Sequence, residues 1–152
     1  MSTSVERAHL ATTAGLVLVV ALDPTARLRG GAAWEPWVLG QQRVDGVMRR
    51  IAPPLFQSTG VLALAATVVA ARRGDRTGVL CRSAVVACVG AAVAVTLRVN
   101  EPVNELVRRW RATDDPAPGW REARARWERA HRVRRVLLAA AGVAAAAGAR
   151  HR

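Results

Sequence analysis

Lysine is absent from the sequence, so all 23 basic residues are arginine, and only 11 residues are acidic. Together with abundant alanine, valine and glycine, this indicates a bias toward GC-rich codons. The net charge of +12 fits nucleic acid, anionic lipid or an acidic partner. The chain carries no recognisable nucleic-acid-binding module, and arginines beside apolar helices normally anchor them to lipid headgroups. We therefore expect the lipid bilayer as a partner and no nucleic acid.

The motifs of several enzyme classes are also missing. We find no Walker loop, no GxGxxG, no serine nucleophile elbow and no paired-carboxylate arrangement. His9, His131 and His151 are far apart, and no His/Cys pair has metal-ligand spacing. Cys81 and Cys88 would lie about 10 Å apart on one helix, too far for a disulfide. The sequence therefore predicts no metal site and no cofactor.

The chain does contain long apolar runs, kept apart from its charged residues. A soluble helical protein would instead spread its charges along each helix. The runs are residues 8–22, 55–71, 79–97 and 133–149. We expect an all-α fold, a four-helix transmembrane bundle forming a single domain over residues 1–152. The last run is rich in alanine and also fits a soluble helix. Arg82, in the first turn of the third run, is expected to extend to the membrane interface.

Two polar loops would lie on one side of the membrane, at residues 23–54 and 98–132. In the first, residues 41–50 have the pattern of an amphipathic helix, and Pro53-Pro54 would end it and begin the next helix. The two loops carry most of the arginines, and the positive-inside rule therefore places them in the cytoplasm. We predict a multi-pass integral membrane protein with both loops in the cytoplasm.

The stretch from 98 to 135 predicts a polar helical hairpin between the third and fourth spans. Residues 99–111 would continue the third helix beyond the apolar run. Aspartates, prolines and a glycine at 114–119 predict a turn. Residues 120–135 would then return antiparallel to the first arm and lead into the last helix.

The hairpin brings the candidate site residues to a common membrane depth. Asn100 and Asn104 are spaced to share one face of the first arm, and Trp127, His131 and Arg134 follow i, i+4, i+7 spacing on the second. Because the arms are antiparallel, we expect two amides, an imidazole and a guanidinium around one pocket. Each also has a structural interpretation, as an interfacial hydrogen-bonding residue or, for tryptophan, a headgroup anchor.

These residues belong to two spaced patterns. The first consists of Asn100, Glu101, Pro102, Asn104, Trp110, Trp127, His131 and Arg134. The second consists of Gln41, Gln42, Arg43, Asp45, Met48, Arg49, Pro53, Pro54 and Leu55. Together they resemble the anthrone oxygenase-like family of small four-helix integral membrane proteins. Some members of that family oxidise anthrones to anthraquinones with O₂ and no established organic cofactor, and most are bacterial proteins with no assigned reaction.

The resemblance implies an oxidoreductase acting on an aromatic small molecule. His131 would then be the general base, and Asn100, Asn104 and Arg134 would stabilise an enolate-like oxygen. The candidates for contact with a flat aromatic substrate are Trp127, Trp110 and Gln41. Two alternatives remain: a non-catalytic membrane protein, such as an accessory subunit or a small-molecule or lipid-binding protein, and a soluble basic helical protein that binds nucleic acid.

Overall fold

The computed structural model describes residues 2–21 and 33–150 and contains helices throughout. The helices are α1 (Ser2–Ala21), α2 (Trp34–Arg72), α3 (Arg76–Val95), the π-helical turn η2 (Thr96–Asn100), α4 (Glu101–Arg109) and α5 (Trp120–Arg150). Because α3, η2 and α4 follow one another without a break, the described ranges form four helical rods and no strand. The expected all-α, four-helix fold is confirmed.

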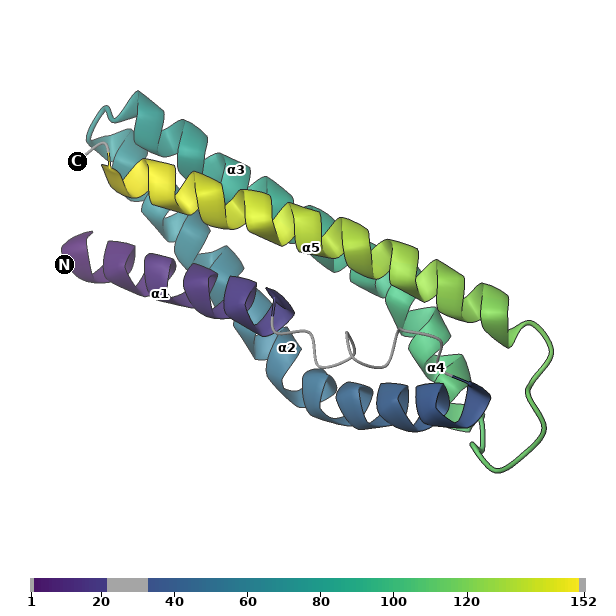
Figure 1. Ribbon diagram of the computed structural model, residues 1–152. Helices are drawn as coiled ribbons and strands as arrows, with labels where there is room; N and C mark the ends of the chain where they lie inside the picture. Colours follow the sequence, from purple (N-terminus) through teal and green to yellow (C-terminus); the bar gives the residue numbers. More distant parts are fainter. Residues whose placement is uncertain (1, 22–32, 151–152) are drawn as a thin grey trace.

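The rods lie side by side in an elongated bundle (Figure 1). The most extensive packing is between α5 and α3, and α1 lies against both α2 and α5. Leu16 of α1, Val85 of α3 and Leu138 of α5 are fully buried in one hydrophobic core cluster. The start of α1, the α2–α3 turn and the end of α5 share one end of the bundle. The start of α2 and the turn before α5 share the other, and we call this second end the hairpin end.

Pro53 and Pro54 lie inside α2, which is one helix of 39 residues. The prediction that a polar loop ends here and a new helix begins is wrong. Proline removes an N–H and crowds the carbonyl four residues earlier, but this bends a helix when both flanking segments are packed on neighbours. Figure 1 shows α2 changing direction along its length. Residues 34–52 therefore form the first part of α2, and residues 23–32 of the predicted loop lie outside the described residues.

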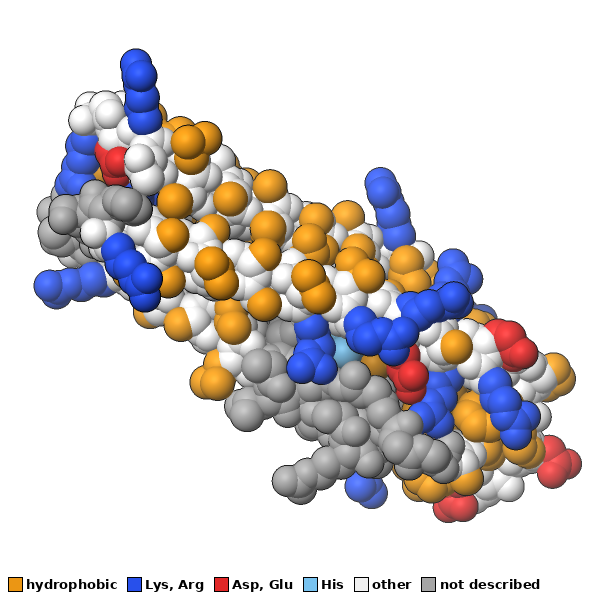
Figure 2. Space-filling model, turned by 45° about the horizontal axis from the view of Figure 1, so that its top comes forward, with side chains coloured by type: hydrophobic (Ala, Val, Ile, Leu, Met, Phe, Trp, Pro, Cys, Tyr) orange, Lys and Arg blue, Asp and Glu red, His pale blue; other side chains and the backbone are white. Residues whose placement is uncertain are grey.

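Two rods of the described chain are long and apolar enough to cross a membrane. They are α2 and the continuous rod Arg76–Arg109. Hydrophobic side chains cover the middle of the bundle and arginines lie toward its ends (Figure 2). Large aliphatic side chains point outward here: Leu80, Val136 and Val143 are each at least 70% exposed. An outer surface of this kind matches hydrocarbon better than water.

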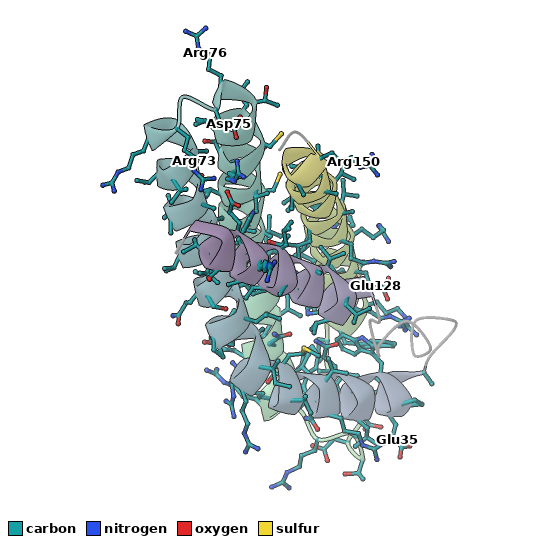
Figure 3. The ribbon with its side chains drawn as sticks, turned by 90° about the vertical axis from the view of Figure 1, so that its left-hand side faces the viewer. Glu35, Arg73, Asp75, Arg76, Glu128 and Arg150 are labelled. Atoms are coloured by element: carbon teal, nitrogen blue, oxygen red, sulfur yellow. The ribbon has the colours of Figure 1, made fainter. Side chains whose placement is uncertain are left out.

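Arg82 is buried against α1 instead of reaching the surface. Its guanidinium lies 3.5 Å from a carboxylate oxygen of Glu6 and 3.5 Å from one of Asp75, and it is 3% exposed. Arg73 donates a hydrogen bond of 3.1 Å to the same oxygen of Glu6. The predicted extension of Arg82 to the interface is wrong, because the sequence pattern did not reveal a carboxylate arriving from α1. Arg73 and Asp75 mark this end of the bundle in Figure 3.

Replacing Glu6 tests this buried pair. We expect Glu6→Ala to destabilise the bundle by about 1–3 kcal/mol, because the buried Arg82 loses one of its two carboxylate partners and keeps only Asp75. Thermal unfolding in detergent micelles measures the change. Glu35→Ala is the matched control, since Glu35 is exposed at the opposite end (Figure 3). An equal unfolding midpoint for the two variants would contradict the assignment.

Candidate functional site

Three side chains of α5 form a continuous stack at the hairpin end. The rings of Trp127 and His131 are 4.9 Å apart and nearly parallel, at 8°. One guanidinium nitrogen of Arg134 lies 2.8 Å from Nδ1 of His131. Trp127 and His131 are each 4% exposed, so this face of α5 points into the protein. The i, i+4, i+7 row predicted from the sequence is present.

The contact with Arg134 fixes where the imidazole carries its proton. A guanidinium has donors only, so Nδ1 of His131 accepts the hydrogen bond and a neutral ring bears its proton on Nε2. Arg134 is held from its other side by Thr96, whose hydroxyl oxygen accepts at 3.3 Å. The Thr96 hydroxyl donates its own proton to the carbonyl of Ala92 at 2.8 Å. Thr96 therefore presents only a lone pair to Arg134.

A network of side-chain amides forms hydrogen bonds with Trp127. The side-chain oxygen of Asn104 accepts hydrogen bonds from the Trp127 indole at 2.9 Å and from the Gln41 amide at 3.0 Å. The Asn100 amide donates to the carbonyl of Trp127 at 3.3 Å. Asn100 is 1% exposed, and its own oxygen has no hydrogen-bond partner within the described chain. The Asn104 side-chain oxygen thus joins α2, α4 and α5.

The π-helical turn η2 places Thr96 and both asparagines in this network. Pro102 has no N–H to give to the carbonyl of Arg98, so the α-helical pattern is already broken there. Instead the N–H of Glu101 bonds to the carbonyl of Thr96, five residues back. Thr96, Asn100 and Asn104 all reach toward other helices from this rod. Turns of this kind occur often at functional sites.

A small cavity of about 60 Å³ opens beside the stack. Its lining comes from three helices: Leu16, Val19, Val44, Met48, Ala52, Leu55, Phe56, Trp127, His131 and Arg134. The walls from α1 and α2 are apolar, and the polar groups lie on the α5 side. The space holds on the order of five water molecules. A three-ring ligand therefore requires the α1 and α2 walls to move apart.

The structure brings most predicted site residues together and leaves one apart. His131, Arg134 and Trp127 line the cavity. Asn104 and Asn100 each form a hydrogen bond with Trp127, and Gln41 forms one with Asn104, so these three residues lie outside the cavity lining. Trp110 is not part of the cavity lining. The catalytic and substrate-binding roles of all these residues stay predictions.

Trp110 belongs to a tryptophan cluster that closes the hairpin end. Its ring lies 5.1 Å from that of Trp34 and 6.0 Å from that of Trp37. Trp120 packs on both of these partners, at 5.7 and 5.9 Å. Trp34, Trp37 and Trp120 are each at most 7% exposed, so the cluster is a hydrophobic core. It holds the start of α2 against both arms of the hairpin.

Sequence reasoning missed two parts of the site. Thr96 lies four residues before Asn100, so extending the Asn100–Asn104 row by one step would have found it. The second is Arg108, which donates to Asp45 at 2.9 Å and to Glu101 at 2.6 Å. No local pattern links Asp45 to Arg108, because they lie 63 residues apart and meet only when α2 packs on α4.

The comparisons with known proteins gave one family match. A family model described as anthrone oxygenase matches residues 47–144, which is more than half of the chain. The matched segment includes the asparagine pair and the stack on α5, while Gln41 lies just before it. No curated protein and no solved structure matches the chain.

Removing the shared acceptor tests the amide network. We expect Asn104→Ala to destabilise the protein by about 1–3 kcal/mol, because it leaves the Gln41 amide and the buried Trp127 N–H without their acceptor. Glu105→Ala, at the exposed neighbouring position, should leave the unfolding midpoint unchanged. Thermal unfolding in detergent compares the two. A similar midpoint for both variants would show that the network contributes no stability.

Proposed function

The chain belongs to the anthrone oxygenase family, and on this premise we propose that it oxidises a flat aromatic substrate of the anthrone type with O₂. In such a reaction an activated methylene loses two hydrogens and becomes a carbonyl. One oxygen atom of O₂ enters the product and the other leaves as water. The observation that carries the proposal is the cavity, which joins apolar walls to the His131–Arg134 pair.

We further propose that the bundle is embedded in the bacterial cytoplasmic membrane as a multi-pass protein. Two long apolar rods and an outward-facing aliphatic surface support this. The site would lie near one membrane face, where the polar hairpin begins. Arginines are frequent along that hairpin, which favours the cytoplasmic side. The lipid bilayer would then supply both a hydrophobic substrate and dissolved O₂.

The chemistry would proceed through an enolate. Loss of a proton from the methylene delocalises negative charge onto the carbonyl oxygen of the substrate. A fixed guanidinium beside the cavity stabilises charge that develops there. The resulting carbanion transfers electrons to O₂, a C–O bond forms, and the hydroperoxide loses water to give the quinone. Trp127 offers an aromatic surface along the cavity for the substrate rings.

The hydrogen bond from Arg134 bears on the role of His131. As a general base, His131 would use Nδ1, and Arg134 would first have to release that nitrogen. As a hydrogen-bond donor, the ring would use its Nε2 proton on the developing oxyanion, and Arg134 could keep its bond to Nδ1. The bond at Nδ1 therefore favours the donor role over the base role implied by the family resemblance.

A non-catalytic ligand-binding protein is the second candidate. The volume of the cavity favours it, because about 60 Å³ holds only part of a three-ring molecule. The same bundle could then carry an apolar small molecule or lipid without reacting with it. Oxygen uptake separates the two candidates.

The reaction is tested with protein purified in detergent and supplied with anthrone. We expect one O₂ consumed per anthraquinone formed, at a rate well above that in protein-free micelles. His131→Ala should lower the rate about 100-fold if the ring takes part in proton transfer or charge stabilisation. Arg132→Gln is the control, because Arg132 is exposed on the same helix turn. Uptake no faster than in empty micelles would remove the proposed activity.

A second variant distinguishes base from donor at His131. Glutamine donates a hydrogen bond but cannot accept a proton near neutral pH. We expect His131→Gln to keep a rate about tenfold above that of His131→Ala, since one fixed donor to an oxyanion contributes at least that much. Equal rates for the two variants would point to the general-base role instead.

Membrane association is tested by fractionation. We expect the protein in the membrane pellet after washing with alkaline carbonate, and in solution only after detergent is added, because two long apolar rods contact lipid. A soluble basic reporter protein is the control for electrostatic adsorption. Release by carbonate alone would support the soluble alternative.

A further inference from the structure

Arg134 is a largely buried cation whose neighbours are uncharged. Its guanidinium donates to the Thr96 hydroxyl at 3.3 Å and to Nδ1 of His131 at 2.8 Å. Its Nε is buried without a hydrogen-bond partner. Among residues 2–21 and 33–150, no Asp or Glu forms an ion pair with it. The positive charge beside the cavity is therefore not neutralised by this part of the chain.

The other inward-facing arginines each have carboxylate partners. Arg82 lies between two carboxylates, those of Glu6 and Asp75. Arg108 also contacts two carboxylates, at 2.9 and 2.6 Å. An isolated charge in an apolar bundle is costly, so such residues normally carry a partner or mark a ligand pathway. Arg134 lines the cavity beside the stack on α5, where a ligand could supply the missing charge.

We infer that the cavity binds a ring-bearing organic anion whose ionised oxygen pairs with Arg134. The apolar walls, including Leu55 and Phe56, would contact the rings, and the guanidinium would hold a phenolate, enolate or carboxylate oxygen. This deepens the proposed function, on which it rests for the ring system, by naming the charge of the bound substrate. An anthrone with an acidic phenol would bind already ionised, before any oxidation.

Thr96 is a positioning residue for this anion site. Because its hydroxyl proton is given to the carbonyl of Ala92, its oxygen can only accept from Arg134. This contact and the one to His131 hold two nitrogens of the guanidinium at once. The remaining donors are thereby kept from turning toward solvent and stay available to an anion.

The test compares two probes of nearly the same size and shape, one anionic and one neutral. 2-Naphthoate and its neutral amide, 2-naphthamide, are titrated calorimetrically into the full chain in phosphatidylcholine nanodiscs, with empty nanodiscs subtracted. We expect naphthoate to bind about tenfold more tightly, because a charge-assisted hydrogen bond is roughly twice as strong as a neutral one. Arg134→Gln should remove the preference, and Arg134→Lys should retain part of it. Arg132→Gln, which changes the same charge at an exposed position, should keep it.

Two further measurements distinguish the anion site from a misfolded variant and from a site occupied by a lipid headgroup. Thr96→Val has nearly the same shape but removes the hydrogen-bond acceptor that holds one side of the Arg134 guanidinium. It should lower the naphthoate preference about threefold without changing naphthamide binding. Adding phosphatidylglycerol to the nanodiscs should leave naphthoate affinity unchanged. Loss of naphthoate binding under those conditions would assign the site to a lipid headgroup and overturn the inference.

Three results contradict the anion site directly: equal affinity for the two probes, no detectable naphthoate binding, or a preference that survives Arg134→Gln. These outcomes are independent of oxygen uptake. A naphthoate preference without anthrone oxidation would keep the anion site and remove the proposed activity. Oxidation without a preference would do the reverse.

Discussion

The side-chain oxygen of Asn104 accepts hydrogen bonds from Gln41 and Trp127, and so one atom joins α2, α4 and α5. Its position determines the site by a chain of contacts. Trp127 is fixed by this bond, His131 stacks on Trp127, and Arg134 bonds to His131. Each contact lies inside the bundle, where competition from water is weak and polar bonds are correspondingly strong. The geometry around the cavity therefore originates in an amide that does not itself line it.

The inward-facing arginines of the bundle have two kinds of surroundings. Arg82 is compensated by Glu6 and Asp75, and Arg108 by Asp45 and Glu101. At the hairpin end Arg134 is left with uncharged partners beside a cavity. Natural proteins break the rule of paired buried charges mainly where a ligand or a reaction requires it. The contrast between Arg134 and the paired arginines is the strongest physical argument for a functional site at the cavity beside Arg134.

The sequence predicted what helical periodicity and chain reversal determine. Spacing alone put Trp127, His131 and Arg134 on one face, and the 114–119 turn returned that face to the asparagines. It failed where a distant partner decides the outcome. Arg82 was misplaced because its carboxylate comes from α1, and the α2 boundary was misplaced because packing keeps the helix continuous through two prolines. Residue spacing predicts which side chains share a helix face, but it does not predict which partner a side chain meets on another helix.

The bend in α2 offers a way for the small cavity to admit a ligand larger than its present volume. Pro53 and Pro54 supply no N–H, so the carbonyls of Arg49 and Arg50 lack their intrahelical bonds. A change of bend angle at this point would break no further backbone hydrogen bonds. Cavity walls come from both halves, with Met48 and Ala52 before the prolines and Phe56 after them. A flexing joint in one rod would then widen the chamber toward the acyl chains, giving a hydrophobic molecule a sideways entrance while the stack on α5 stays in place.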